Sequence, residues 1–204
     1  MPAPAVVLRN EPVQARSTQR LESLLDSAAA AIDAVGFERL TTAMVAEGAG
    51  ASIGTVYRYF PDRISVLQAV AARAVSRFQE RVQATIAEGD FSSWWDFINA
   101  VIDDAVTAFQ SEPAFASLRF GDMLDLRPRE NSHTGSSEVA SVLSSYLSSR
   151  FGLNNDANLA FHLEVGFNLC DSLLHRAFMY DAQGDKRFIT EARSAVRNYL
   201  ERVL

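Results

Sequence analysis

Apolar residues recur at three- and four-residue intervals along most of the chain, with polar and charged residues between them. This spacing places apolar side chains on one face of an α-helix, whereas a half-buried strand would need strict alternation. Long stretches contain neither glycine nor proline, which fits uninterrupted helices. The pattern therefore predicts an all-α protein with about nine helices.

Helix boundaries follow from this pattern together with the capping and stop residues. We expect a flexible arm over residues 1–16 and a short helix after Pro113, and we interpret the polar segment 125–137 as a surface loop. The other eight helices are predicted at residues 17–35, 42–48, 53–59, 63–87, 92–110, 138–150, 156–180 and 186–203.

The strongest local signals lie within residues 40–67. Thr41 and Ser52 stand directly before two short predicted helices, where a hydroxyl oxygen can accept a backbone N–H bond and cap the helix. Gly50 lies in the turn between those helices, where a Cβ would be a steric problem. Two short helices joined by such a turn, followed by the start of a longer helix, are typical of a helix-turn-helix DNA reader.

Charge is distributed unevenly along the chain. The 204 residues are 48% hydrophobic and 22% charged, as in an ordinary soluble globular protein, but the net charge of −6 argues at first against DNA binding. Residues 1–79 hold eight arginines against seven acidic residues, and the excess of acid lies in residues 80–204. Attraction to phosphate would then depend on a few placed groups rather than on a strong field.

Several kinds of site and location are disfavoured by composition. A single cysteine, Cys170, excludes an internal disulfide and a multi-cysteine metal site, and the three histidines lack the spacing of a zinc motif. No apolar run approaches the roughly 18 to 20 residues of a membrane span, and the N-terminus does not have the pattern of a secretory signal. We therefore expect a cytoplasmic protein that uses no metal or cofactor and no membrane.

Residues 41–67 resemble the TetR family of bacterial transcriptional regulators. The matching positions are Thr41, Val45-Ala46, Ala49-Gly50, Ser52, Gly54-Thr55, Tyr57, Tyr59-Phe60 and Arg63. The resemblance implies an α-helical homodimer, in which an N-terminal three-helix domain binds DNA and a larger C-terminal domain binds a ligand and dimerises. On this chain we expect those domains at residues 17–62 and 63–204.

The resemblance also implies roles for side chains in binding a double-stranded DNA operator. Ser52, at the start of the second short helix, would help to present backbone N–H groups to phosphate, while Thr55 and Tyr57 would donate hydroxyls to phosphates or touch base edges. Phe60 is interpreted as a core residue, whereas Tyr59 could be either a core residue or a DNA contact. The expected DNA contacts are Thr41, Ser52, Ile53, Gly54, Thr55, Tyr57, Arg58 and Arg63.

Ile53 and Arg58 occupy variable positions of the family's second short helix. Ile53 could contact a thymine methyl group, and Arg58 could reach guanine or a phosphate. Arg63 stands where the family usually has lysine, and a guanidinium can clamp a phosphate there. Ala43 departs from a position that is often polar or basic, so one contact is missing. Arginines at positions 9, 16 and 20 could add electrostatic help.

Aromatic residues are frequent in the C-terminal part of the chain. For any one of them, packing in a helical core is the simpler interpretation. Together they suit a pocket between helices for an apolar small molecule. The expected ligand contacts are Trp94, Phe97, Phe109, Phe120, Met123, Phe161, Phe167, Asn168 and Asp171.

The last two predicted helices, residues 156–180 and 186–203, carry broad apolar stripes. Such stripes could cover the core of a monomer, but they also resemble the family's dimer seam, a four-helix bundle across a two-fold axis, which we favour. Cys170, Asp171 and His175 could suggest a nucleophile, but without a nucleophile elbow or an oxyanion loop we expect no enzyme. A redox role for Cys170 is a further alternative, although a buried cysteine is usually inert packing.

The function that follows is a ligand-responsive transcriptional regulator, most simply a repressor. It would bind a palindromic operator as a dimer and be released by a small, largely apolar or aromatic effector. The alternative is a helical small-molecule-binding module with a weak or vestigial DNA reader. Only the net charge and Ala43 favour that alternative.

Overall fold

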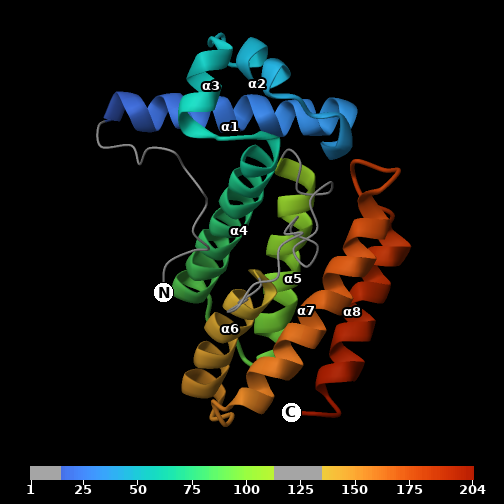
Figure 1. Ribbon diagram of the computed structural model, residues 1–204. Helices are drawn as coiled ribbons and strands as arrows, with labels where there is room; N and C mark the ends of the chain where they lie inside the picture. Colours follow the sequence, from blue (N-terminus) through green and yellow to red (C-terminus); the bar gives the residue numbers. More distant parts are fainter. Residues whose placement is uncertain (1–14, 113–134) are drawn as a thin grey trace. The chain divides into compact units, whose positions relative to one another are not determined.

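The computed structural model describes residues 15–112 and 135–204, and Figure 1 shows the arrangement of their helices. These two ranges contain eight α-helices, one short 3-10 helix and no strand, which confirms the all-α prediction. Residues 1–14 of the predicted arm, the short helix expected after Pro113 and residues 125–134 of the predicted loop lie outside the described residues. So do two of the predicted ligand contacts, Phe120 and Met123. Residues 15–16 and 135–137, predicted as arm and loop, belong to helices instead.

Each described α-helix begins and ends within three residues of its predicted bounds, and the 3-10 helix η1 was not predicted. In chain order the helices are α1 (Ala15–Val35), η1 (Phe37–Arg39), α2 (Thr42–Gly48), α3 (Ile53–Tyr59), α4 (Arg63–Glu88), α5 (Trp94–Ser111), α6 (Gly135–Phe151), α7 (Ala157–Phe178) and α8 (Lys186–Leu200). None of them is both long enough and apolar enough to cross a membrane.

The described residues form two compact units, one ending at Ala74 and the other beginning at Val75. We call these the N-terminal unit and the C-terminal unit. The sequence suggests a boundary at residue 62, where α4 begins, whereas the units divide inside that helix. α4 therefore contributes its first half to one unit and its second half to the other.

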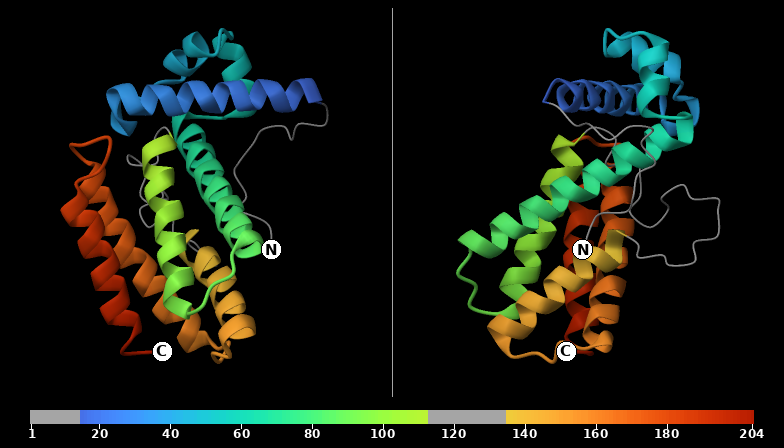
Figure 2. Two further views of the ribbon diagram at one scale, coloured as in Figure 1. Left: turned by 180° about the vertical axis from the view of Figure 1, so that it is seen from behind. Right: turned by 60° about the vertical axis from the view of Figure 1, so that its left-hand side comes forward.

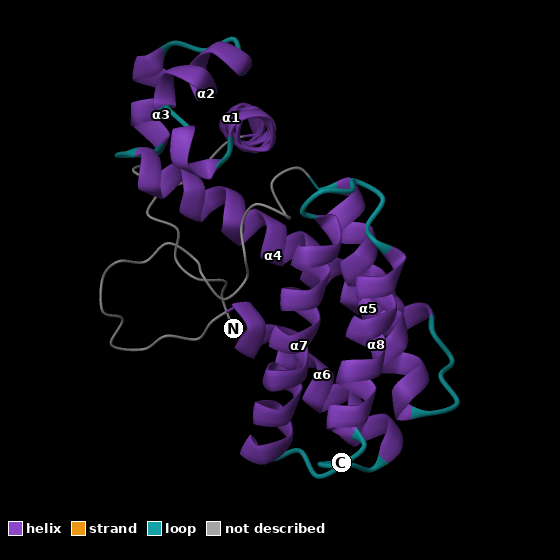
Figure 3. Cartoon of the chain, turned by 90° about the vertical axis from the view of Figure 1, so that its right-hand side faces the viewer, coloured by secondary structure: helices purple, strands orange, loops and turns teal. Residues whose placement is uncertain are grey.

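The N-terminal unit is a small bundle with one apolar core. Figure 3 shows α1 end-on, with α2 and α3 beside it. The apolar positions of α1 face those two helices and the start of α4, and the side chains of Leu24, Ile32, Val45, Val56 and Phe60 are fully buried. Burial of this stripe, rather than intrinsic propensity, holds such short helices, because isolated helices of seven residues are not stable in water.

The C-terminal unit is built from the second half of α4 and from α5 to α8. In the two views of Figure 2, α7 and α8 run side by side, and α7 also packs against α6. A Cβ at Gly166 of α7 would lie 3.6 Å from the Leu200 side chain of α8, which is an ordinary packing distance, so the glycine does not relieve a clash between the two helices. The core of this unit contains Phe78, Phe97, Leu147 and Leu174.

Candidate nucleic-acid interface

The predicted caps and turn of the helix-turn-helix are present. The Thr41 hydroxyl oxygen accepts a bond from the backbone N–H of Met44 at 3.2 Å, and Ser52 accepts one from Thr55 at 3.2 Å. Gly50 has φ of 56°, in the left-handed region that a residue with a Cβ rarely adopts. These local interactions fix where α2 ends and where α3 begins.

α3 presents one face to the core and another to solvent. Val56 is fully buried and Tyr59 is 5% exposed, whereas Ile53 is 48% exposed and Tyr57 is 41% exposed. Arg58 is also exposed. A large aliphatic group and a phenol on the outer face of a capped helix have no role in the unit's own core. Such side chains suit contact with another molecule.

Hydroxyl groups of α2 and α3 are joined in pairs on this part of the unit. Thr42 donates to the phenol oxygen of Tyr57 at 3.3 Å, and the hydroxyls of Ser52 and Thr55 lie 3.0 Å apart. Thr42 was not among the predicted DNA contacts. The sequence shows it only as the residue after a cap, and its partner lies 15 positions away.

Arg63 is placed differently from the expectation of a free phosphate clamp. Its guanidinium donates to the backbone carbonyl oxygens of Phe37 at 3.2 Å and Glu38 at 2.7 Å, and so joins the start of α4 to η1. Asp62 caps α4 by accepting the backbone N–H of Ser65 at 2.8 Å. The contact of Arg63 with phosphate stays a prediction, and its hydrogen bonds show a structural role inside the unit.

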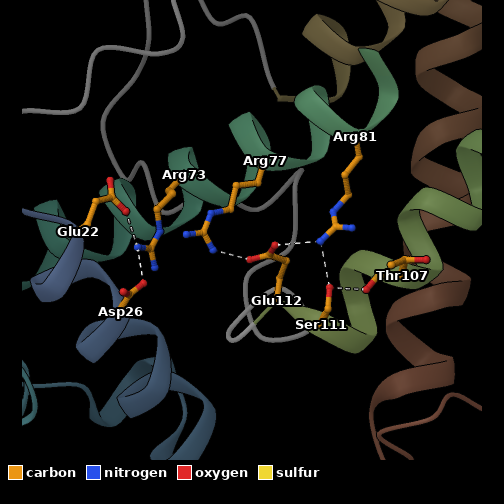
Figure 4. Close-up of polar contacts among 8 residues, drawn as sticks. All are labelled: Glu22, Asp26, Arg73, Arg77, Arg81, Thr107, Ser111 and Glu112. Atoms are coloured by element: carbon orange, nitrogen blue, oxygen red, sulfur yellow. Dashed lines mark hydrogen bonds and ion pairs between the residues drawn. The ribbon is translucent and has the colours of Figure 1, made fainter. Parts of the chain in front are cut away.

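Two groups of ion pairs lie along α4, one within each unit (Figure 4). In the N-terminal unit, Arg73 binds Glu22 at 3.0 Å and Asp26 at 2.7 Å, both on α1. Its side chain is only 12% exposed. The periodicity that located α1 and α4 gave no indication of this link, because its partners lie 47 and 51 residues away.

In the C-terminal unit, the carboxylate of Glu112, at the end of α5, forms ion pairs with two arginines. Arg77 lies 2.9 Å and Arg81 3.3 Å from its carboxylate oxygens, and Arg81 also donates to the Ser111 hydroxyl at 3.2 Å. Burial opposes ionisation of Glu112, but the hydrogen bonds and charges of the two arginines outweigh it, and the pKa of the carboxyl is lowered from 4.5. The carboxylate is therefore charged at neutral pH.

Two family models match the chain. Residues 24–70 match the model described as bacterial regulatory proteins, tetR family, and residues 92–204 match the Tetracyclin repressor-like C-terminal domain. The second match alone covers more than half of the chain. The chain belongs to the TetR family.

Two solved structures are similar to the chain. A solved TetR-family regulator from Streptomyces coelicolor is 32% identical, covers 91% of this chain and 99% of its own, and superposes with a TM-score of 0.75. FadR from Bacillus subtilis, solved in complex with stearoyl-CoA, is 17% identical, covers 88% of this chain and 97% of its own, and has a TM-score of 0.64, which shows the shared fold.

Among curated proteins, the transcriptional repressor KstR of Mycobacterium tuberculosis is 26% identical over 109 residues, which is 53% of this chain and 49% of KstR. KstR of Rhodococcus jostii is 35% identical over 63 residues, or 31% of this chain and 30% of that protein. The chain thus spans less than half the length of these curated relatives.

The described residues predicted to contact a ligand in this TetR-family chain fall into a buried, an exposed and a half-buried set. Phe97, Phe109 and Asp171 are buried in the C-terminal unit, and Phe109 stacks on Phe178 with ring centroids 5.2 Å apart. Phe161 is instead 57% exposed, and Asn168 is exposed and donates to the Glu164 carbonyl oxygen at 2.8 Å. The structure therefore does not bring these two residues together with the buried set.

The other two described residues of that prediction are half-buried. Phe167 lies against Phe78, with ring centroids 6.0 Å apart, and Trp94 contacts Trp95 at the start of α5. An open hollow of about 480 Å³ at the connection of α7 to α8 is lined by none of the predicted ligand contacts.

Cys170 is buried in the C-terminal unit, and burial together with the charge of Asp171 raises the pKa of its thiol to about 12. At pH 8 it should carry roughly a thousandfold less thiolate than an ordinary cysteine, so native protein should react very slowly with iodoacetamide. Mass spectrometry should show rapid alkylation only after unfolding in guanidinium. Rapid alkylation of folded protein at pH 8 would instead support a redox role.

Proposed function

We propose that the chain is a ligand-responsive transcriptional regulator that acts as a repressor. Two copies of α3, one from each protomer of a dimer, would enter successive major grooves of a palindromic operator. The observation that carries the proposal is the outward face of α3, where Ile53 and Tyr57 are exposed on a helix capped by Ser52. The family assignment supports the same function.

Each exposed group of α3 has a chemistry that suits DNA. The side chain of Ile53 can contact a thymine methyl group, and Arg58 can donate to guanine or to phosphate. A Cβ at Gly54 would meet nothing closer than 3.8 Å, so its glycine leaves room for DNA rather than relieving a clash within the protein. Thr55 and Tyr57 supply hydroxyl donors for phosphates or base edges.

A dimer formed through α7 and α8 is the proposed assembly. Large apolar side chains lie exposed along α7 and just beyond its end, namely Phe161, Leu169, Met179 and Tyr180. A row of this kind suits a self-complementary contact across a two-fold axis, which would bury it in both protomers. A dimer is required because a palindromic operator has two half-sites, and each half-site is contacted by the α3 helix of one protomer.

The proposed effector is small and largely apolar or aromatic. The buried aromatic groups Phe97 and Phe109 and the half-buried Phe167 would form an apolar environment for it, and Asp171 would supply a polar group within α7. The stearoyl-CoA complex of the Bacillus subtilis relative is compatible with an apolar effector. An effector that binds better to a dimer with wrongly spaced readers would lower operator affinity by linkage.

Substitution Tyr57→Phe tests the reader directly. An operator is first selected from random duplex DNA with the full-length protein. Loss of one hydroxyl donor from each protomer should then weaken operator binding about thirtyfold to a thousandfold in a gel-shift titration at fixed salt, because each hydrogen bond to a charged phosphate contributes on the order of 1–2 kcal/mol. The dimer measured by light scattering should be unchanged.

Tyr146→Phe is the matched control, since it removes a phenol hydroxyl from α6 of the C-terminal unit, outside α3 and outside the proposed dimer helices α7 and α8. It should leave operator affinity unchanged. If the selection enriches no sequence, the vestigial-reader alternative is correct. If an operator is found but both substitutions behave alike, Tyr57 does not contact DNA.

A further inference from the structure

The arginines of the N-terminal unit are not equally engaged. Arg63 is held by carbonyl oxygens and Arg73 by two carboxylates. Arg16, Arg20 and Arg58 are exposed, and the described residues place no carboxylate within ion-pair distance of them. The net charge of residues 1–79 is close to zero, but the charges are not spread evenly. Glu22 and Asp26 neutralise Arg73, while other cations face solvent.

A tyrosine links the two segments of the N-terminal unit that carry these exposed arginines. The phenol of Tyr59, at the end of α3, lies 3.0 Å from the hydroxyl of Ser17 and donates to the Ser17 carbonyl oxygen at 3.3 Å. The Arg58 guanidinium lies over the same ring, 5.7 Å from its centroid. Tyr59 is 5% exposed, so its ring is a fixed support between the start of α1 and the end of α3.

Helix geometry places the other two arginines beside this support. Arg16 and Arg20 are four residues apart on α1 and so lie on one side of the helix. Arg20 is about 60° around the helix axis from Ser17, the residue bonded to Tyr59. The start of α1 therefore carries its two cations next to the end of α3, which carries the third.

We propose that Arg16, Arg20 and Arg58 form a phosphate-binding edge, which contacts the DNA backbone beside the groove entered by α3. This inference rests on the proposed function of the reader. Contacts to phosphate add affinity and fix orientation without reading sequence. Ser17 and Tyr59 are positioning residues, because their hydrogen bonds hold the two arginine-bearing segments together.

The edge is tested by the double substitution Arg16→Gln with Arg20→Gln in the full chain. The logarithm of the binding constant is measured against the logarithm of salt concentration, on the selected operator and on a scrambled duplex. Each lost phosphate contact should reduce the slope by about 0.9, which gives about 3.6 for two arginines in both protomers of a dimer. On the scrambled duplex the slope should fall in the same way, because the contacts are independent of sequence.

The double substitution Arg150→Gln with Lys186→Gln is the control for a general effect of losing positive charge. It removes two exposed positive charges from the C-terminal unit. This variant should keep the wild-type slope. If its slope falls as far as that of the Arg16/Arg20 variant, or if the Arg16/Arg20 variant keeps the wild-type slope, the edge does not exist. The proposed function survives either result, since it fails only if wild-type protein selects no operator.

The positioning role is tested with Tyr59→Phe, which keeps the buried ring and removes its hydroxyl. In the wild-type background this variant should lower the salt slope by part of the amount lost in the Arg16/Arg20 variant. In the Arg16/Arg20 background it should have no further effect on the slope. A purely structural loss would instead weaken operator binding equally in the wild-type and Arg16/Arg20 backgrounds. Equal effects would overturn the positioning role.

Discussion

Replacing Phe60 with alanine is expected to unfold the N-terminal unit and abolish operator binding. Phe60 has no exposed surface, and it ends α3 with a backbone N–H bond to the Val56 carbonyl oxygen at 2.9 Å. Removing a fully buried phenyl group costs about 3–5 kcal/mol. A small unit with a single core has a total stability of that order, so this loss should exceed what the unit can tolerate.

Hydrogen exchange followed by mass spectrometry is the measurement for Phe60→Ala. Peptides from α1 to α3 should lose protection, while peptides from α7 and α8 should keep it, because the core of the C-terminal unit is untouched. Ile53→Ala is the control, since its side chain is 48% exposed and its removal should leave protection unchanged. Retained protection of α1 to α3 in Phe60→Ala would show that this core does not depend on the phenyl group.

Substitution Glu112→Ala is expected to destabilise the C-terminal unit by about 1–3 kcal/mol. It leaves Arg77 and Arg81 without the carboxylate that both bind, and that carboxylate is only 12% exposed. A fully buried pair would cost more to break, but the side chains of Arg77 and Arg81 are 40% and 35% exposed, and solvent screens part of the loss.

The dependence on pH gives a second signature of Glu112. Because the pKa of its carboxyl is lowered in the folded protein, the charged form contributes stability above the ordinary value of 4.5. That contribution is lost as the pH falls through the lowered pKa. Denaturant unfolding of the wild type and of Glu112→Ala should therefore differ at pH 7 and converge in acid.

Asp90→Ala provides the control for Glu112. Asp90 also pairs with an arginine, Arg150, at 3.2 Å, but its side chain is fully exposed. Exposed pairs of this kind contribute little, so the variant should unfold like the wild type. If Glu112→Ala and Asp90→Ala have the same free energy of unfolding at pH 7, the ion pairs of Glu112 contribute no more to stability than an exposed pair.

The sequence predicted the helix-turn-helix well because its determinants are local. Thr41 and Ser52 cap helices that begin at the next residue, and Gly50 lies in a turn that its own backbone angle defines. The buried side of α1 followed from the spacing of its apolar residues. Such features depend on neighbours within about one helical turn, which the sequence displays directly.

The interactions that the sequence did not predict join distant segments. Arg63 binds carbonyl oxygens 25 and 26 residues away, and the Thr42–Tyr57 hydrogen bond links α2 to α3. Every backbone carbonyl is an acceptor, so a sequence pattern cannot indicate which one an arginine will reach. For the same reason, the phosphate role of Arg63 followed from resemblance alone.

The ligand prediction met a different difficulty on α7. Leu163 is 2% exposed and Phe161 is 57% exposed, although both are large and apolar. The exposed residues of α7 mix apolar Phe161 with polar Asn168, so polarity does not mark the outer side of the helix. Aromatic content therefore could not separate residues that line the interior from those that lie on the surface.

The buried state of Cys170 has a practical consequence for spectroscopy. It is the one cysteine of the chain, and its thiol is masked in the folded protein. A cysteine introduced at the exposed position Ala43 of α2 would then be the single site open to a maleimide dye or a nitroxide label, with no need to remove the natural one. Labels at that position on both protomers would report the distance between the two readers, with and without an effector.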